Sequence, residues 1–508
     1  MQLSKQTLNK ISPQAGLVIP EPRMFDLPEK VLQFGTGVLL RGLPDYFIDK
    51  ANRSGEFNGR IVIVKSTSQG SADAFDQQDG LYTLYVKGIE NGKMTEEAII
   101  NSSISRVLSA NEQWQEVLQC AHNPEMKIII SNTTEVGIVL KEDDDITSSP
   151  PASFPGKLLS FLYERYKAFY GREDSGMVIV PTELITDNGN KLLSIVLQLA
   201  NKNDVGQKFI DWLTGANHFC NSLVDRIVPG KLPEAEKNIA EAKFGYKDEL
   251  MIMAETFRLW AIESASARVK EMLSFSKSDP GVVITPDIEK FRELKLRLLN
   301  GTHSFACALA FLAGFDTVKE AMQDEDISNY VRKLMMLEIA PALDGETISY
   351  NEACAFGNQV SDRFRNAALD HKWISISMNY TSKMKLRNVA LLLKQHAKTG
   401  SVPENMVLGF AAYLLFMKCS KGADEKFYGE ANGKKYAIQD EAAPYFFNKW
   451  AIKNIDTFVD SILSDKELWG TDLSVLNGFA AAVKEDLQLL TSRGAMATLA
   501  AKQIKTVA

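Results

Sequence analysis

The sequence has few cysteines and histidines, and none of them is spaced as a metal site requires. It lacks any C-x-x-C pair, and its odd number of cysteines argues against a disulfide framework, so the thiols are expected to be reduced: Cys120, Cys220, Cys307, Cys354 and Cys419. The five histidines show no H-E-x-x-H or similar ligand spacing. We therefore expect no metal centre.

Long hydrophobic runs and an excess of positive charge are also missing. The longest apolar run, Met406 to Met417, is too short to cross a bilayer, and the first sixteen residues lack the apolar core of a signal peptide. The net charge is −7, whereas nucleic acids and anionic membranes bind proteins with concentrated Lys and Arg. These absences predict a cytoplasmic protein whose partner is a small molecule. A monomer is compatible with this composition.

The length of 508 residues favours more than one domain. Strand-like apolar segments dominate the first half, and long segments with helical periodicity follow the Asp279-Pro280-Gly281 turn. The pattern predicts an α/β domain with a mostly parallel sheet over residues 1–280 and a mostly α-helical domain over 281–508. The run at 406–417 is expected to be a central helix of the second domain.

A glycine turn near the N-terminus is the first candidate ligand site. Val31 to Phe34 reads as a strand, Gly35-Thr36-Gly37 as a tight turn, and the next residues as a helix, which is the Rossmann-type dinucleotide-binding arrangement. The motif is incomplete, because Leu40 replaces the third glycine and Pro44 would kink or restart the helix. An ordinary glycine turn is the alternative. The expected cofactor contacts here are Phe34, Gly35, Thr36, Gly37, Val38 and Arg41.

The next strand, Arg60 to Lys65, leaves the choice of cofactor open. A strand in this place usually ends in Asp or Glu, which binds the ribose 2′-hydroxyl of NAD. This one ends in Lys65, and a basic residue could accommodate the 2′-phosphate of NADP.

Two further buried strands are each followed by a polar turn. Met126 to Ser131 precedes a turn that could border the nicotinamide ribose, because ligands of open α/β sheets lie beyond the carboxyl ends of strands: Asn132, Thr133, Thr134 and Glu135. Gly176 to Pro181 leads to Asn188-Gly189, where the Asn188 amide could donate to a reacting oxygen. Turn formation alone would explain the Asn-Gly pair equally well.

The segment Lys295 to Ser304, KLRLLNGTHS, carries the candidate catalytic side chains. Thr285 and Pro286 predict a helix start, and at α-helical spacing Lys295, Asn300 and His303 share little more than a third of its circumference. A desolvated lysine can act as a general acid or base, an asparagine amide can donate to a developing alkoxide, and a histidine can orient either partner. The trio thus suits a metal-free alcohol/ketone dehydrogenase. The plainer alternative is two solvated charges and a core histidine.

A cationic segment in the helical half is a candidate carboxylate site. Arg363 to Lys385 concentrates basic side chains around a short apolar core. We expect Lys383 and Arg365 to bind a substrate carboxylate, the alternative being charges at the surface or between helices.

Several of these segments together resemble the long-chain mannitol dehydrogenase family of polyol and sugar-acid dehydrogenases. The landmarks follow the family's order over the first three-fifths of the chain: GTGVLLR at 35–41, ELITDNG at 183–189, NSLVDRIVPG at 221–230, ETFRLWAIE at 255–263 and KLRLLNGTHS at 295–304. Lysine followed by asparagine at +5 and histidine at +8 is the most specific of them. The segments at 121–138 and 299–322 resemble the branch that acts on uronates.

The resemblance implies an NAD-binding Rossmann-type domain, a helical domain and an active site in the cleft between them. It implies that Lys295 is the general acid/base, that Asn188 and Asn300 hold the reacting oxygen, and that His303 orients the substrate. A basic residue at position 65 resembles the uronate branch, which uses NAD, and NADP stays open.

The implied reaction is the NAD-dependent interconversion of D-tagaturonate and D-altronate in hexuronate catabolism. A reductase of fructuronate or a dehydrogenase of mannitol or another polyol is the nearer alternative. A nucleotide-binding protein without turnover is the alternative from another class, and a binder would have no use for the four polar residues together.

Overall fold

The computed structural model describes residues 1–66, 72–133 and 137–505. The chain forms two compact units, one of Met1–Gly88 with Met94–Ile288 and the other of Ile89–Lys93 with Glu289–Ala508. The first unit therefore extends eight residues beyond the expected boundary at residue 280. The reason is strand β13 (Val282–Thr285), which pairs with β12 (Leu259–Glu263) of the same unit.

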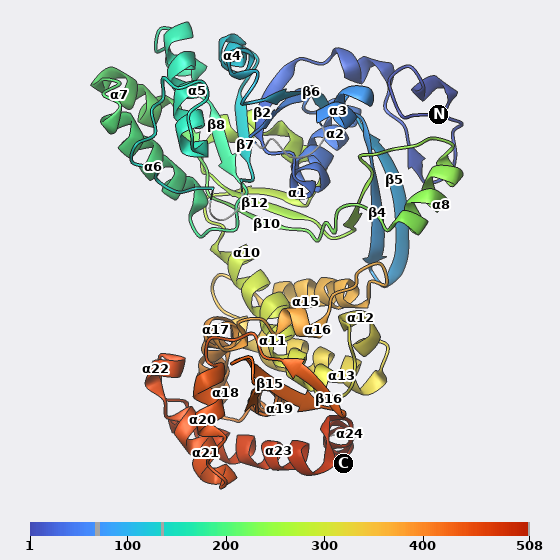
Figure 1. Ribbon diagram of the computed structural model, residues 1–508, viewed down its shortest axis with the longest axis vertical. Coiled ribbons are helices and arrows are strands. Elements are labelled where there is room, and N and C mark those ends of the chain that lie inside the picture. The colour runs from blue at the N-terminus through green and yellow to red at the C-terminus, as the bar shows by residue number, and fades with distance from the viewer. Residues whose placement is uncertain (67–71, 134–136, 506–508) are drawn as a thin grey trace. The chain divides into compact units, whose positions relative to one another are not determined.

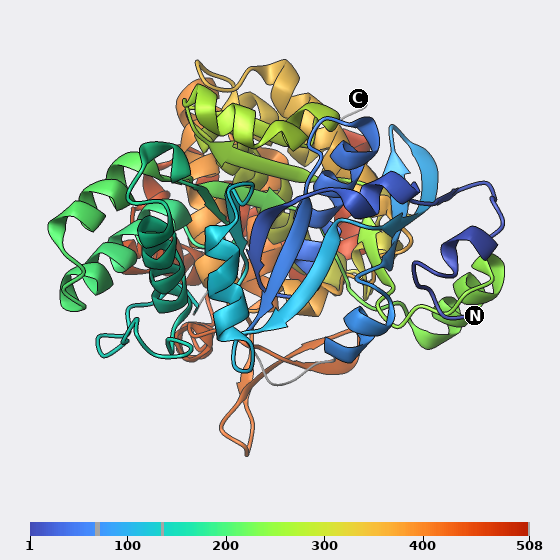
Figure 2. The ribbon, with the colours of Figure 1, turned by 90° about the horizontal axis from the view of Figure 1, so that it is seen from above.

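The first unit contains a six-stranded sheet in which every strand pair is parallel. The spatial order is β6-β3-β2-β7-β8-β9, so the chain starts in the middle, builds one half and then returns to build the other (Figure 2). This is the strand order of the dinucleotide-binding fold, whose switch point here lies between β2 and β7. The strands are β2 (Glu29–Phe34), β3 (Arg60–Lys65), β6 (Ile104–Ser109), β7 (Ile128–Ser131), β8 (Val178–Pro181) and β9 (His218–Phe219).

Both faces of this sheet are buried, which explains why its strands are continuously apolar. Leu32 and Val62 lie in one core with residues of α4–α7, whereas Val31 and Ile61 lie in another with α1 and α2. Figure 1 shows α5, α6 and α7 grouped beside β7 and β8. The helices are α1 (Val38–Gly42), α2 (Pro44–Ser54), α3 (Ala72–Gln77), α4 (Trp114–Gln119), α5 (Phe154–Ala168), α6 (Asn188–Lys202) and α7 (Gln207–Ala216).

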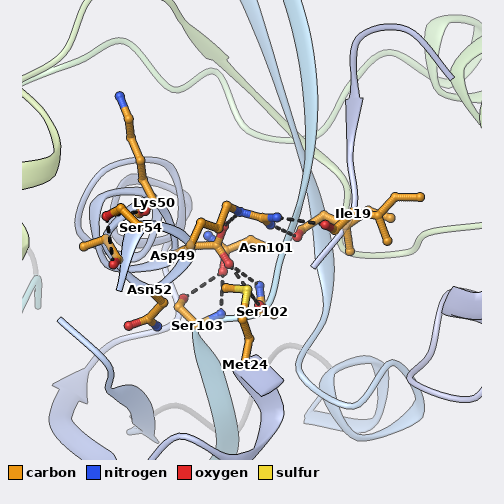
Figure 3. Close-up of polar contacts among 12 residues, drawn as sticks. Ile19, Met24, Asp49, Lys50, Asn52, Ser54, Asn101, Ser102 and Ser103 are labelled. Carbon is orange, nitrogen blue, oxygen red and sulfur yellow. Dashed lines mark hydrogen bonds and ion pairs between the residues drawn. The ribbon is translucent and has the colours of Figure 1, made fainter. Parts of the chain in front are cut away.

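Helix α2 restarts at Pro44 and is fixed by a buried carboxylate on its inner face (Figure 3). Asp49 accepts hydrogen bonds from the backbone N–H and the hydroxyl of Ser102, at 2.8 and 3.0 Å, and pairs with Arg53 at 2.7 Å. Arg53 in turn donates to the carbonyls of Ile19 and Ile100. These bonds connect α2 to the turn between β5 (Lys93–Asn101) and β6.

Two smaller sheets complete the first unit. One has the order β1-β5-β4-β11 and the other β10-β12-β13. Their remaining strands are β1 (Leu17–Val18), β4 (Tyr82–Glu90), β5 (Lys93–Asn101), β10 (Ser222–Asp225) and β11 (Ile252–Glu255), and two helices, α8 (Glu234–Phe244) and α9 (Ala267–Met272), accompany them.

The second unit is mostly helical, as expected, and α19 (Glu404–Phe416) is its buried central helix. Its other helices are α10 (Glu289–Leu294), α11 (Thr302–Leu312), α12 (Val318–Ala321), α13 (Glu325–Lys333), α14 (Ala340–Leu343), α15 (Tyr350–Arg365), α16 (Trp373–Ile376), α17 (Tyr380–Lys383), α18 (Ala390–Thr399), α20 (Ala443–Lys449), α21 (Ile455–Leu463), α22 (Lys466–Trp469), α23 (Phe479–Arg493) and α24 (Ala495–Lys505). Three π-helical segments interrupt them: η6 (Lys295–Gly301), η7 (Leu334–Ile339) and η8 (Met384–Val389).

Two features of this half of the chain were not expected from the sequence. A three-stranded antiparallel sheet, β14 (Ser420–Lys421), β15 (Phe427–Ala431) and β16 (Lys434–Ala437), interrupts the helices, with Asn432-Gly433 as its hairpin turn at φ values of 51° and 70°. Thr285 ends β13 instead of capping a helix, and α10 begins at Glu289. Strand pairing outweighs the local capping signal there. None of the helices described in residues 1–505 is long and apolar enough to cross a membrane.

Candidate functional site

The glycine turn lies at the carboxyl end of β2, beside the switch point of the sheet. Gly35 has a φ of 122°, and a Cβ there would come within 3.0 Å of the Asn132 carbonyl oxygen and the Leu40 side chain. Gly35 is therefore required by backbone conformation and by the close approach of the β7 turn. Gly37 is different, because a Cβ there would meet no atom within 4 Å. The turn thus has open space over Gly37 into which a ligand can approach the backbone.

The turn after β7 is fixed by a buried carboxylate from the end of β8. Glu183 is 2% exposed and accepts hydrogen bonds from the backbone N–H and hydroxyl of Thr133, both at 2.9 Å, and from the Ser131 hydroxyl at 3.1 Å. Burial raises its pKa, and these bonds oppose the rise. The Asn132 amide donates to the carbonyl and hydroxyl oxygens of Thr182. These hydrogen bonds therefore hold the turn after β7 against the turn after β8.

Most of the expected cofactor contacts gather at these strand ends. Phe34 ends β2, Gly35, Thr36 and Gly37 form the turn, and Val38 begins α1. Lys65 ends the adjacent strand β3, in register with β2, and is 9% exposed. Asn132 and Thr133 follow β7, whereas the expected contacts Thr134 and Glu135 lie outside the described residues.

Arg41 does not fit its expected role as a cofactor ligand. It is 6% exposed, donates to the Leu250 carbonyl oxygen at 2.7 Å and lies 5.4 Å from the centre of the Tyr82 ring. Its guanidinium is therefore directed into the interior of the first unit, where it stabilises packing and not a phosphate.

The side chain of Asn188 holds its own turn together. Its amide nitrogen lies 3.0–3.1 Å from three carbonyl oxygens, those of Pro181, Glu183 and Ser222, and its oxygen accepts from the backbone N–H groups of Gly189 and Ser222. An amide has two hydrogens, so three acceptors leave none free for a ligand. In this conformation Asn188 braces the end of β8 and does not present a donor to a reacting oxygen.

Lys295 and Asn300 lie in η6, a π-helical segment of the second unit. The expected separation of about 140° holds for an α-helix. In a π-helix each hydrogen bond spans five residues, so the helix turns less per residue and position i+5 comes closer to the line of position i. Lys295 and Asn300 have this spacing, and both are partly exposed. The π-helix thus brings them closer together around the helix axis than sequence reasoning expects.

The π-helical register is held by reciprocal bonds between η6 and η8. Arg297 of η6 donates to the carbonyl oxygens of Leu386 and Arg387, at 2.8 and 2.7 Å. In return, Arg387 lies 3.5 Å from the Asn300 carbonyl and 3.2 Å from the Ser304 hydroxyl, and Asn388 donates to the Gly301 carbonyl. These side chains donate hydrogen bonds to backbone carbonyl groups that would lack a partner where the α-helical pattern is interrupted.

His303 lies one turn further along, in α11, among aromatic and basic side chains. It is 7% exposed and stacks on Phe364 at 4.3 Å, with the His371 ring at 5.1 Å. Burial, reinforced by nearby cations, lowers its pKa well below the usual value. Its Nε2 is buried and makes no hydrogen bond with the residues that the structure describes. A neutral imidazole with one unused nitrogen can accept from or donate to a bound hydroxyl.

Of the two cations expected to bind a carboxylate, only Lys383 is near His303. Lys383 donates to the Ile376 carbonyl at 2.8 Å, and its charge contributes to lowering the pKa of His303. Arg365 is exposed and donates to the Ser328 hydroxyl at 3.2 Å. Sequence reasoning missed Arg387, although its position four residues after Lys383 places both on one face of a helical turn.

In the described part of the chain, no three His, Cys, Asp or Glu side chains converge as a metal site requires. The polar groups of the second unit are instead an ammonium, a carboxamide, an imidazole and a guanidinium. Together they can bind oxygens, orient a carbonyl and transfer a proton without a metal.

The sequence of each unit matches a described family. Residues 29–274 match the family described as Mannitol dehydrogenase Rossmann domain, and residues 287–491 match Mannitol dehydrogenase C-terminal domain. The chain is 38% identical over 475 residues to an altronate oxidoreductase of Klebsiella pneumoniae strain 342, covering 92% of this chain and 95% of the relative. It is 36% identical over 476 residues to an altronate oxidoreductase of Halalkalibacterium halodurans, covering 92% of each.

Two solved structures share the fold. Mannitol 2-dehydrogenase of Pseudomonas fluorescens, in a ternary complex with NAD and D-mannitol, is 25% identical, with a TM-score of 0.67 over 99% of this chain and 100% of that chain. A substrate-free D-sorbitol dehydrogenase is 19% identical, with a TM-score of 0.78 over 98% and 100%, and shows the fold alone.

Proposed function

The chain belongs to the mannitol dehydrogenase family, and from this premise we propose that it interconverts D-tagaturonate and D-altronate with NAD as the hydride carrier. The observation that carries the proposal is the 38% identity to an altronate oxidoreductase over 92% of the chain. The mannitol enzyme of known structure is less similar, at 25%. Breakdown of hexuronates is the process in which we propose that the reaction takes place.

The strand ends of the first unit supply the cofactor site in this proposal. Three observations support this fit. The space over the backbone of Gly37 is open, and position 35 accepts only glycine because a Cβ there would approach the Asn132 carbonyl oxygen. Hydrogen bonds also fix the turn at Asn132 and Thr133. When bound, NADH supplies the hydride that reduces the ketone. Lys65 is proposed to lie at the adenine ribose, where it is compatible with NAD and would also accept the phosphate of NADP.

Lys295 is the proposed general acid for ketone reduction and the general base for alcohol oxidation. Its ammonium donates a proton to the oxygen that becomes the altronate hydroxyl, and in the reverse direction its amine takes that proton back. Asn300 donates an amide N–H to the same oxygen and stabilises the charge that develops on it. His303 orients the neighbouring hydroxyl through Nε2. Asn188 is assigned a structural role, because its amide hydrogens are already used.

The carboxylate of the substrate is assigned to the cations that act on His303, of which Lys383 is one. Arg365 is not part of this assignment, because it lies exposed against Ser328. A carboxylate site distinguishes a sugar acid from a neutral polyol.

One panel of substrates tests the proposal. Purified enzyme is mixed with NADH, and separately with NADPH, and absorbance at the nicotinamide band is followed after adding tagaturonate, fructuronate, tagatose or fructose. We expect the fastest oxidation with NADH and tagaturonate. Faster turnover of fructuronate would identify the protein as a fructuronate reductase. Faster turnover of a neutral ketose would identify it as a polyol dehydrogenase. No turnover with any of these compounds would support a nucleotide-binding protein without catalytic activity.

A further inference from the structure

Four basic side chains from four different segments act electrostatically on His303. They are Arg363 in α15, His371 in the following connection, Lys383 at the end of α17 and Arg387 in η8, and the charge of each acts to lower the pKa of the imidazole. Positive groups brought together in a partly buried place repel one another. Such an arrangement is stabilised when an anion binds among them.

Arg387 has hydrogen-bond donors that the described residues leave unused. Its Nη1 is placed by the Ser304 hydroxyl and the Asn300 carbonyl. Its Nε and Nη2 make no hydrogen bond, and the guanidinium no ion pair, with any residue in the described ranges. Burial alone lowers its pKa. Two parallel N–H donors of a guanidinium match the two oxygens of a carboxylate.

Lys383 complements Arg387 from the preceding turn. Its ammonium has three hydrogens and, among the residues that the structure describes, donates to one acceptor, the Ile376 carbonyl. The carboxylate that acts to raise the pKa of Lys383 is that of Asp440, whose oxygens accept from the backbone N–H groups of Thr381 and Ala442 and from the Thr381 hydroxyl. That carboxylate therefore caps local backbone while Lys383 keeps donors for a ligand.

The position of Arg387 relates this anion site to the reacting groups. Its contacts, Asn300 and Ser304, end η6 and begin α11, the same helical stretch that carries Lys295 and His303. In a ketohexuronate the ketone and the carboxylate lie toward opposite ends of one six-carbon chain. A sugar acid that places its ketone at Lys295 and Asn300 can therefore extend its carboxylate toward the neighbouring cations.

We propose that Arg387, assisted by Lys383, binds the carboxylate of the substrate and makes the enzyme selective for sugar acids over neutral sugars and polyols. The inference rests on the proposed function, since it assigns the acid end of the same substrate. Arg365 has no part in it.

The test compares an acid with a neutral sugar of the same length. In Arg387→Gln, kcat/KM for tagaturonate is expected to fall about a hundredfold, the usual scale for losing one partner of a desolvated charge pair. The value for tagatose should fall far less, because it loses only the support that the contacts to Ser304 and Asn300 give to the helix. Arg387→Lys should recover part of the loss for the acid. Lys372→Gln, which removes an exposed cation of the same segment, is the matched control and should change neither value. Equal losses for both sugars would overturn the proposal, because they would show that Arg387 only supports the helix.

A binding measurement separates this proposal from the proposed reaction. Tagaturonate should raise the melting temperature of the wild-type enzyme in the presence of NAD⁺, with which the ketone cannot react, and the shift should disappear in Arg387→Gln but persist in Lys372→Gln. If the wild type binds the acid in this way but does not oxidise NADH, the reaction is wrong and the anion site stands. If Arg387→Gln keeps the full shift, or the wild type shows none, the anion site is wrong.

Discussion

Lys295 and Asn300 are one hydrogen-bond span apart in a π-helix, so the two residues are closer together around the helix axis than in an α-helix. We expect Asn300→Ala to lose roughly 3 kcal/mol of transition-state stabilisation, the usual effect of removing one donor to a developing oxyanion. The loss should fall on kcat, with NADH affinity unchanged. Steady-state kinetics with tagaturonate and a fluorescence titration with NADH measure the two quantities. An unchanged kcat would remove Asn300 from this role.

Lys295→Ala should abolish most turnover, because no other described side chain in η6 can exchange a proton in its place. NADH binding should be retained, since the expected cofactor contacts belong to the first unit. Lys290→Ala is the matched control: Lys290 lies in α10, five residues earlier, and pairs with Glu352. Single-turnover reduction of tagaturonate should be lost only in the Lys295 variant. Wild-type rates in Lys295→Ala would refute the assignment.

Glu183 should control the order of the cofactor turn without touching the substrate. Its carboxylate receives the Thr133 N–H and two hydroxyls, and hydrogen bonds to a charged acceptor contribute about 1.5–3 kcal/mol each. Glu183→Ala is expected to weaken NADH binding at least tenfold, and Glu183→Gln, which keeps one acceptor oxygen, to weaken it less. Glu125→Ala removes an exposed carboxylate just before the opposite end of β7 and serves as control. Calorimetric titration with NADH gives the affinities, and equal affinities in all four proteins would contradict the role.

The strands of the first unit could be predicted because a strand that is buried on both faces consists of a continuous run of apolar residues. Arg60 to Lys65 is a strand with these bounds, and the restart of the helix at Pro44 follows from proline chemistry. The same local reasoning failed at Thr285. This residue type is common at helix N-caps, but here it ends β13, which pairs with β12. It also passed over Asn432-Gly433, although this pair is a strong hairpin signal.

The site could be predicted only in part, because its geometry depends on distant segments. The sequence KLRLLNGTHS carries the right side chains, but the π-helical register comes from bonds with residues about ninety positions later, such as Arg387. Asn188 illustrates the opposite case. Asn-Gly is equally compatible with a donor to a ligand and with a turn, and its bonds to Pro181 and Ser222 show that it holds the turn.

A buried acid in the first unit should make stability depend on pH. Asp45 in α2 is fully buried, and burial raises its pKa from 3.8 to about 8, with the nearby Arg41 opposing the rise. Between these two values the carboxyl is neutral in the folded protein and ionised in the unfolded chain. The stability it contributes is therefore complete below about pH 4 and is lost progressively as the pH rises through 8.

Asp45→Asn replaces the acid by a neutral group of similar shape, so the variant should lack this pH dependence. Relative to wild type, its free energy of unfolding should increase from pH 5 to pH 8.5 by several kcal/mol, since each pKa unit corresponds to about 1.4 kcal/mol. Urea unfolding of both proteins at the two pH values measures the difference. Asp211→Asn, at an exposed position of α7, should show no such trend. A constant difference between Asp45→Asn and wild type would mean that Asp45 is already ionised in the folded state, held by Arg41.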